Sequence, residues 1–338
     1  MSRAENKNQI AYIVQHKNSN ICSQSTAGGA FSSIAEFVID NGGVVFGVEM
    51  TSDYKIQHTC VDKKNDLWKY RNSKYVQSNV GDTYKKVKEL LIANRLVCFS
   101  GTPCQIEGLV SFLGKNYENL VLVDVVCRAV PSPGVWEKYI EMEKHKYGEF
   151  DSIRFRDKGL GYQYSTMMMK TKDQKVYRGG IESQPWLRMF FSGMIIRPSC
   201  TECRFRSRYR KSDFTIWDCF NIHSIDKSFN EDCGTTRVLV HTEKGKHIFD
   251  LIKKDFIYKE IPADIAVNGV TEMLNSPTAH KNRNSFYSDF HTMDIDNLIK
   301  KYYPRTAKVV LKKYARLILN RFGLDKTVKH ILKKGWWL

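Results

Sequence analysis

Residues 94–133 constrain the fold more than any other part of the chain, and they read NRLVCFSGTPCQIEGLVSFLGKNYENLVLVDVVCRAVPSP. An apolar run over 96–100 predicts a buried strand, a Gly-Thr-Pro break ends it, and apolar residues recur at helical spacing after Cys104. A Val-rich run over 120–126 predicts a second strand, with Cys127 directly after it. Parallel strands joined by a right-handed crossover lie in one sheet, and open α/β sheets bind ligands outside the carboxyl ends of their strands. The segment therefore predicts a βαβ unit whose two thiols point at a cofactor site.

Strand and helix signals continue along the rest of the chain. Further strands are predicted over residues 10–14, 44–48, 212–218, 237–242 and 257–261, with a β-rich insertion over 152–177. Helices are predicted over 31–38, from Asp82 onward, and over 135–146, 186–194, 243–253 and 295–303. The pattern indicates an α/β fold with α+β insertions, in which a mixed or parallel sheet with βαβ units carries the cofactor site at its strand carboxyl ends. The predicted domains are a core over 1–303, with parts near 8–90 and 91–260, and a basic helical tail over 304–338.

Composition narrows the class of protein. The 338 residues include 42% hydrophobic side chains, which is typical of a folded chain with a sizeable core. The amino terminus is polar and no apolar run is long enough to span a bilayer, so we expect a cytoplasmic protein. Nine cysteines, an odd number, then favour metal binding, catalysis or core packing over a disulfide framework.

The net charge of +17 predicts an acidic partner or surface, and the charge is unevenly distributed. Ten Lys and Arg residues follow Pro304, against Asp325 alone. A second basic cluster consists of Arg204, Arg206, Arg208, Arg210 and Lys211. No recognition helix, zinc finger or RNP pattern accompanies these charges, so we do not predict nucleic-acid binding.

Cysteine spacing predicts a four-thiolate site. Cys200-Thr-Glu-Cys203 is a CxxC pair, whose tight turn lets two thiolates reach one metal or cluster. Cys104 and Cys127 complete a set of four, with Cys219 as the alternative fourth ligand. The remaining thiols are interpreted as core or surface residues: Cys22, Cys60, Cys98 and Cys233. From the residues alone, structural zinc and an iron-sulfur cluster explain the set equally well.

Two polar segments could hold an anionic cofactor. The glycine-containing stretch 23–31 leads into a helix, where free amide groups attract a phosphate or a flavin edge. This stretch by itself favours the alternative, an ordinary N-cap and turn. In segment 70–78, Lys74 could stabilise the negative charge of a reduced isoalloxazine near N1, or lie in solvent like most lysines.

Six ordered motifs together resemble the beta subunit of coenzyme F-420 hydrogenases and dehydrogenases, including bacterial relatives that often lie near polysaccharide-biosynthesis genes. The motifs are Ser25-Thr-Ala-Gly28-Gly29, Ser73-Lys74-Tyr75-Val-Gln77-Ser78, Gly101-Thr102-Pro103-Cys104-Gln105, Cys127 with Pro131-Ser132-Pro133, Arg197-Pro198-Ser199-Cys200-Thr-Glu-Cys203, and Ser212-Asp213 with Ile216 and Asp218. The resemblance extends from about Ala11 to about Asp255.

This resemblance implies FAD (or FMN) and a 4Fe-4S cluster. It makes the cluster ligands Cys104, Cys127, Cys200 and Cys203. It also places the flavin against Ser25, Thr26, Gly28, Gly29, Lys74, Tyr75, Gln77, Ser78, Gly101 and Thr102.

The chain departs from the family pattern in three places. It has no amino-terminal ferredoxin segment, so a separate carrier is expected to supply electrons. Arg128 stands where the family commonly has His, and Trp217 where it has Gly before the Asp. The bulk of Trp217 leaves open whether F-420 is the acceptor.

The sequence thus predicts an iron-sulfur flavoprotein oxidoreductase, but it does not indicate which residues are catalytic. Electrons would pass between a ferredoxin- or flavodoxin-like carrier, the cluster, the flavin and an organic acceptor, either a small molecule or a polyprenol-linked intermediate of surface-polysaccharide synthesis. The carrier is expected to dock on a surface that includes some residues of the basic cluster 204–211; the alternative is that this cluster is a solvated run of charges. The alternative is a non-catalytic scaffold with a structural zinc held by four cysteines and a basic recruiting tail.

The tail over 304–338 has apolar residues at helical spacing among Lys and Arg, and it ends in Trp336-Trp337-Leu338. Such a helix either lies peripherally on the inner membrane surface or packs on the core or a second subunit.

Overall fold

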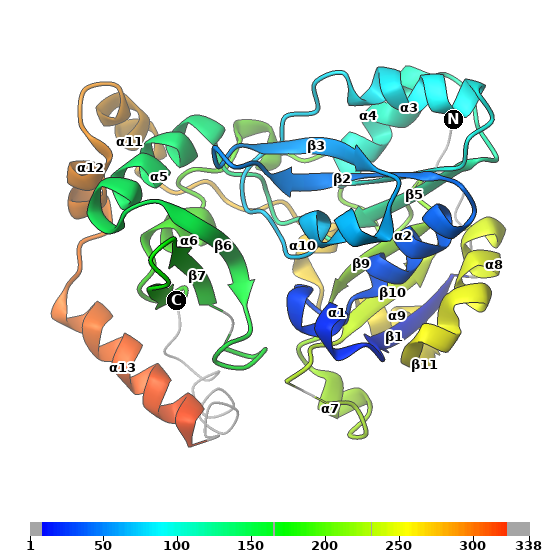
Figure 1. Cartoon of the computed structure of the whole chain (residues 1–338). Helices are drawn as coiled ribbons and strands as arrows, with labels where there is room; N and C mark the ends of the chain where they lie inside the picture. The colour runs from blue at the N-terminus through cyan, green and yellow to red at the C-terminus, as the bar shows by residue number, and fades with distance from the viewer. Residues whose placement is uncertain (1–8, 165, 231, 323–338) are drawn as a thin grey trace. The chain divides into compact units, whose positions relative to one another are not determined.

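A computed structural model describes residues 9–164, 166–230 and 232–322 (Figure 1). The chain groups into two compact units. Unit 1 consists of Met1–Glu137 and Ile196–Thr278, and unit 2 consists of Lys138–Ile195 and Ala279–Leu338. This grouping does not test the predicted division into an oxidoreductase core over 1–303 and a basic tail over 304–338, which stays a prediction.

Unit 1 is built on an eight-stranded sheet with the order β11-β1-β10-β9-β5-β4-β2-β3. Its strands are β1 (Ile10–His16), β2 (Val44–Met50), β3 (Ile56–Val61), β4 (Val97–Gly101), β5 (Leu120–Val125), β9 (Phe214–Asp218), β10 (Thr236–Val240) and β11 (Phe256–Pro262). Strands β2, β4, β5 and β9 are parallel neighbours, and β10 is antiparallel to both β9 and β1. Strand β1 therefore runs in the same direction as these four, and all five have their carboxyl ends at one edge of the sheet.

The predicted βαβ unit is confirmed as β4, α4 (Pro103–Leu113) and β5. Helix α4 begins at a capping box, in which Thr102 is the N-cap and the Gln105 side chain accepts a hydrogen bond from the Thr102 backbone N–H. It ends at Gly114, whose left-handed conformation (φ 72°) suits glycine. Cys104 thus lies in the first turn of the helix that follows β4.

Helices cover both faces of this sheet, which explains why its central strands read as nearly continuous apolar runs. One face packs against α2 (Ala30–Asp40) and α8 (Glu243–Ile252). The other packs against α3 (Thr83–Ile92) and α4. The shorter helices of unit 1 are α1 (Ser19–Gln24), η1 (Lys64–Tyr70), η2 (Pro198–Cys200), α7 (Ile222–Ile225), η3 (Lys253–Asp255), α9 (Ala263–Val267) and α10 (Thr271–Leu274).

Unit 2 contains an antiparallel sheet of β6 (Phe150–Asp157), β7 (Thr166–Thr171) and β8 (Val176–Gly179). Its helices are α5 (Pro133–Tyr147), which begins in unit 1, α6 (Pro185–Phe191), α11 (Arg283–Phe290), α12 (Ile295–Tyr302) and α13 (Ala307–Arg321). The central strand β7 carries Met167, Met168 and Met169, which are all buried and form part of the core of this unit.

The α/β class and the mixed sheet agree with the sequence-based prediction. Strand β3, antiparallel to β2, was not predicted. The basic tail is helical over Ala307–Arg321, whereas 323–338, with Trp336 and Trp337, lie outside the described residues. Within the described part of the chain, no helix has the length and hydropathy that crossing a bilayer requires.

Candidate functional site

The candidate site lies at the carboxyl edge of the parallel strands in unit 1. Thr102 and Cys104 follow β4, and Cys127 lies two residues after β5. A hydrogen bond from the Arg197 backbone N–H to the Val130 carbonyl (2.9 Å) holds the CxxC segment against the loop that follows β5. A β-bridge between Pro131 and Ile196 does the same. Three separate segments therefore bring cysteines to this edge.

The four predicted ligands form one electrostatic group. The pKa of the Cys127 thiol is raised to about 12, mainly by loss of water, with smaller contributions in the same direction from the thiols of Cys104, Cys200 and Cys203. Burial also raises the pKa of Cys200, with contributions from Cys104 and Cys203. Such mutual effects require the sulfur atoms to be close together. A bound cation would reverse them, because it stabilises the thiolate form of each ligand.

The donor set fits an iron-sulfur cluster. Among the residues that the structure describes, no group of three or more His, Cys, Asp or Glu side chains is arranged to hold a single metal ion. A 4Fe-4S cluster makes a different demand, because each of its four cysteine thiolates binds a separate iron of a body larger than one ion. Four neighbouring thiols from three segments are the ligands that such a cluster takes.

Cys219, the alternative ligand, belongs to the core of unit 1. It is buried in an apolar cluster with Ile222 and Phe229, and its thiol points to the Asn221 side chain at 3.8 Å. Cys22 and Cys98 are also buried, Cys60 is exposed and Cys233 is half-buried, as expected for core and surface thiols.

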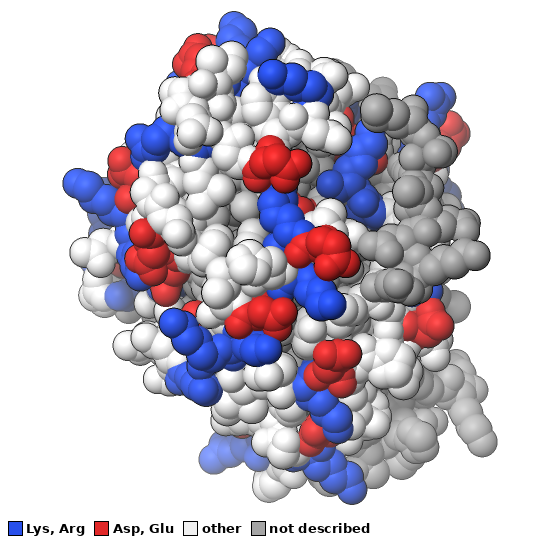
Figure 2. All heavy atoms as spheres, turned by 90° about the vertical axis from the view of Figure 1, so that its right-hand side faces the viewer, with Lys and Arg blue, Asp and Glu red and all other residues white. Residues whose placement is uncertain are grey.

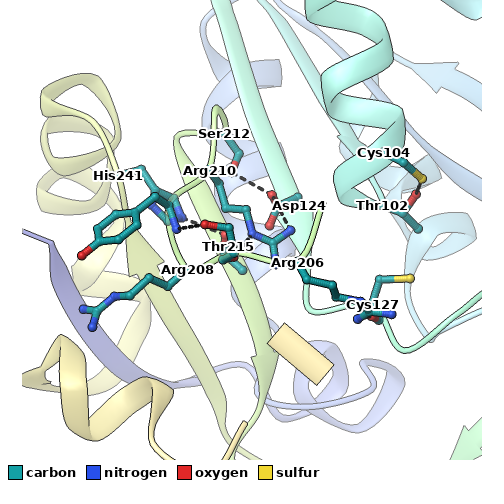
Figure 3. A network of polar contacts seen from close by, with 12 residues as sticks. Thr102, Cys104, Asp124, Cys127, Arg206, Arg208, Arg210, Ser212, Thr215 and His241 are labelled. Carbon is teal, nitrogen blue, oxygen red and sulfur yellow. Dashed lines mark hydrogen bonds and ion pairs between the residues drawn. The ribbon is translucent and has the colours of Figure 1, made fainter. Parts of the chain in front are cut away.

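The basic cluster after the CxxC pair is largely engaged within the chain. The Arg206 guanidinium donates to the carbonyl oxygens of Cys127, Arg128 and Glu272. Figure 3 shows this side chain reaching Cys127. Three other members also make contacts within the chain: Arg208 contacts Gln9 and Asp264, Arg210 contacts Asp124, and Lys211 contacts Glu107.

This geometry weakens the predicted docking surface. The Arg210 side chain is only 5% exposed, and the Lys211 ammonium is 2.8 Å from the Glu107 carboxylate. On the face drawn in Figure 2, Lys and Arg are interspersed with Asp and Glu rather than gathered into one basic field. Most charged side chains of the cluster 204–211 are therefore engaged in hydrogen bonds and ion pairs within the chain.

Figure 3 shows a buried polar network to the left of Cys104 and Cys127. Burial raises the pKa of Asp124 to about 6, although the nearby Arg210 opposes the shift. The Ser212 hydroxyl donates to Asp124 Oδ2 at 3.0 Å, and Thr215 Oγ1 lies 2.8 Å from His241 Nε2. The network ties β5 to β9 and β10 directly beneath the site.

Two of the predicted flavin segments are in direct contact. The Thr26 hydroxyl accepts a hydrogen bond from the Ser73 backbone N–H at 2.7 Å and lies 3.0 Å from the Ser73 hydroxyl. Arg71 donates to Gln24 Oε1 at 2.6 Å and to the Ser32 hydroxyl at 3.3 Å. The guanidinium therefore lies beside the first turn of α2, where backbone N–H groups and the helix dipole add further positive potential.

A second chain of hydrogen bonds joins segment 73–78 to the start of α4. The Gln105 amide donates to the Ser78 hydroxyl at 2.9 Å, and that hydroxyl lies 3.1 Å from His58 Nδ1. His58 Nε2 lies 3.2 Å from the Ser100 carbonyl oxygen. This series of hydrogen bonds connects Ser78 with Thr102, because the Gln105 side chain contacts both residues.

The predicted glycines have structural explanations of their own. A Cβ at Gly28 would lie 2.2 Å from the Val14 carbonyl oxygen and 2.8 Å from the Thr236 backbone nitrogen. Gly29 is the N-cap of α2 with φ 86°, a conformation that favours glycine. Gly101 is the last, buried residue of β4.

The remaining predicted residues lie along the same segment. The Lys74 ammonium donates to the carbonyl oxygens of Lys69 (2.6 Å) and Arg71 (3.0 Å). The Gln77 backbone N–H donates to the Pro131 carbonyl at 2.9 Å, and Tyr75 is half-buried. The segment 73–78 thus lies against the loop that carries Cys127.

Sequence reasoning missed Arg71 and His58, and it assigned Arg206 to a docking surface rather than to the backbone around Cys127. Arg71 lies at the edge of a motif that was recognised, and Arg206 follows the CxxC pair by three residues. His58 gave no signal, because it is brought to the site by the unpredicted strand β3.

Comparison with known families gives one match. Residues 94–265, just over half of the chain, match the model of the coenzyme F-420 hydrogenase/dehydrogenase beta subunit, C terminus. The chain belongs to this family. The match contains the whole βαβ unit, both CxxC cysteines and strands β9 to β11, so the resemblance seen in the sequence is confirmed.

Among solved structures, a chain of the xenon-derivatised F-420-reducing nickel-iron hydrogenase complex from Methanosarcina barkeri is similar, with a TM-score of 0.51. The alignment covers 83% of this chain and 91% of that one at 12% identity. This likeness shows that the two chains share an α/β fold. A comparison with curated proteins finds no match.

Proposed function

We propose that this family member is an iron-sulfur flavoprotein oxidoreductase. It would move electrons between a ferredoxin- or flavodoxin-like carrier, a 4Fe-4S cluster, FAD (or FMN) and an organic acceptor. The observation that carries the proposal is the convergence of four thiols from three segments at the carboxyl edge of the parallel strands. The family, named for hydrogenase and dehydrogenase subunits, supports electron transfer.

Cys104, Cys127, Cys200 and Cys203 would hold the cluster, which when bound would supply one-electron transfer. Two features of the chain suit a cluster ligand at Cys104. The residue lies in the first turn of α4, where the helix dipole stabilises negative charge. The Thr102 hydroxyl is 3.1 Å from its sulfur and can donate a hydrogen bond to a thiolate.

The flavin would lie against Ser25, Thr26, Gly28, Gly29, Lys74, Tyr75, Gln77, Ser78, Gly101 and Thr102. When bound, it would accept electrons singly and deliver a hydride. The hydrogen bonds between Thr26 and Ser73, and from Ser78 through Gln105 to Thr102, support one continuous site rather than separate turns. Arg71 beside the first turn of α2 suits the phosphate end of the cofactor.

The acceptor would be a small molecule or a polyprenol-linked intermediate of surface-polysaccharide synthesis, on the strength of the family resemblance. The donor would be a separate redox protein, because the similar solved chain is part of a hydrogenase complex. The carrier would be a ferredoxin- or flavodoxin-like protein on the strength of the family resemblance. Its docking surface is not assigned to the cluster 204–211, because most charges of that cluster make contacts within the chain.

The protein would act in the cytoplasm and contact the inner membrane surface through α13. The exposed side chains Leu311, Tyr314 and Ile318 recur on one side of this helix. The other side faces unit 2, where Arg316 pairs with Glu182 at 2.7 Å and Asn320 donates to the Leu160 carbonyl at 2.8 Å. An outward apolar stripe on a helix without acidic residues suits anionic lipid.

The second candidate is a non-catalytic scaffold with zinc on the same four cysteines. Four thiols alone would suit either metal. The scaffold gives no reason for the polar segments around Thr26 and Ser78 to meet at the same edge of the sheet, so we favour the oxidoreductase.

Anaerobic purification followed by an absorption spectrum, metal analysis and mass spectrometry of the released cofactor tests the proposal. We expect flavin bands above a broad iron-sulfur absorption, with about four irons per chain for one 4Fe-4S cluster. A colourless protein with stoichiometric zinc and no flavin would establish the scaffold instead.

A further inference from the structure

The Arg206 guanidinium lies beside the four-thiol group and binds the backbone around it. It donates to the carbonyl oxygens of Cys127 and Arg128, in the loop after β5, and to that of Glu272, at α10. A planar guanidinium presents several N–H donors in a fixed fork, so three acceptors hold it in one place. The position of this charge relative to Cys127 is therefore set by the backbone.

The charge of Arg206 is not neutralised by these contacts. Its three acceptors are carbonyl oxygens, which carry dipoles rather than full charges. Arg208, two residues along, differs because its guanidinium lies 2.5 Å from the Asp264 carboxylate. The carboxylate of Glu272 is itself 3.2 Å from Arg128. Arg206 therefore contributes a full positive charge beside the cysteines, because its guanidinium binds the Cys127 carbonyl oxygen directly.

One donor of Arg206 also remains available. Its Nε is buried and has no hydrogen-bond acceptor among the residues that the structure describes. A buried N–H without an acceptor is costly, and a thiolate or sulfide beside it would relieve that cost. Hydrogen bonds to sulfur and nearby charge are two of the factors that set the reduction potential of an iron-sulfur cluster.

We propose that Arg206 is a positioning residue that raises the reduction potential of the cluster by fixing a positive charge beside Cys127. The inference rests on the proposed function, since it presupposes a cluster on these cysteines. On reduction, one electron enters the cluster from the donor, no covalent bond changes, and the cluster with its thiolates becomes more negative by one charge. A fixed positive charge stabilises that more negative state, so the potential rises.

The test is the midpoint potential of the cluster, measured by anaerobic dithionite titration of the whole chain with EPR detection. Samples are matched for iron content. Arg206→Gln removes the charge and should shift the midpoint to a more negative value. Arg206→Lys keeps the charge and should leave it close to the wild-type value. Arg208→Gln, which removes a paired charge in the same segment, is the matched control and should leave it unchanged.

An unchanged midpoint in Arg206→Gln would overturn the proposal, because the charge would then have no effect on the cluster. Equal shifts in Arg206→Gln and Arg206→Lys would also overturn it, because the hydrogen bonds of the guanidinium rather than its charge would then set the potential. If Arg206→Gln does not retain iron, Arg206→Lys decides: a wild-type midpoint supports the role of charge, and a shifted one overturns it. Absence of any cluster from the wild-type protein would instead contradict the proposed function.

Discussion

Gln105 Nε2 donates a hydrogen bond of 2.9 Å to Ser78 Oγ, and the same side chain accepts the Thr102 backbone N–H at 2.9 Å. One amide thus closes the capping box of α4 and ties it to the segment predicted to bind the flavin. Gln105→Ala should destabilise the fold by about 1 kcal/mol, the usual cost of losing a cap, as measured by urea unfolding.

The same substitution should weaken flavin binding, because Ser78 and Thr102 lose their common partner. Flavin retention during gel filtration measures this. Gln174→Ala, at an exposed turn of unit 2 that contains none of the site residues, is the control. Full flavin retention in Gln105→Ala would show that the bridge is structural alone.

Serine in place of any of the four predicted ligands should lower the iron content. Cys104→Ser, Cys127→Ser, Cys200→Ser and Cys203→Ser each remove a thiolate that a hydroxyl replaces poorly at iron. Cys98→Ser is the matched control, since Cys98 is buried inside β4 and faces the core. Iron analysis of anaerobically purified protein measures the effect. Loss of iron in Cys219→Ser with retention in Cys127→Ser would mean that the fourth ligand was misassigned.

Gly28→Ala should destabilise unit 1 by about 2 kcal/mol or more, because the added methyl would overlap the backbone of both β1 and β10. Gly134→Ala is the control, as nothing lies within 4 Å of a Cβ there and alanine suits a helix. Thermal unfolding of the two variants measures the difference. Equal stability of both would show that Gly28 serves only the cofactor.

The sequence predicted the βαβ unit well because its signals are local. The strand runs around Val97 and Val123, and the helix between them, are each encoded by adjacent residues. The four cysteines followed from spacing together with the direction of parallel strands. These features require no knowledge of distant contacts.

The features that escaped prediction depend on contacts between distant segments. The direction of Arg206 could not be predicted, because its acceptors lie in loops around Cys127 and Glu272. Charge composition therefore predicted a docking surface where the structure has internal hydrogen bonds. His58 was missed for the same reason, since its partner Ser78 lies on another segment.

Acid should destabilise the fold partly through His58. Burial lowers the pKa of this imidazole from 6.5 to about 4, so the folded protein holds it neutral. Between pH 4 and 6.5 the unfolded chain binds more protons at this residue than the folded protein does. The free energy of unfolding therefore rises with pH across this window. Full protonation costs about 3 kcal/mol. In His58→Asn, urea unfolding should depend less steeply on pH between 4 and 6.5; an unchanged slope would contradict the burial argument.

The outward stripe of α13 should bind anionic vesicles. Leu311, Tyr314 and Ile318 are 70%, 55% and 56% exposed, and no acidic side chain lies in the helix to repel lipid phosphate. In a flotation assay, the protein should rise with vesicles containing phosphatidylserine and not with neutral ones, and the bound fraction should fall as salt increases. The triple change to Ser at 311, 314 and 318 should abolish flotation, whereas Ile181→Ser, which alters an exposed apolar residue elsewhere in unit 2, should not. Flotation of the triple variant, or a mass in solution that falls from dimer to monomer with it, would mean that the stripe faces another protein surface rather than lipid.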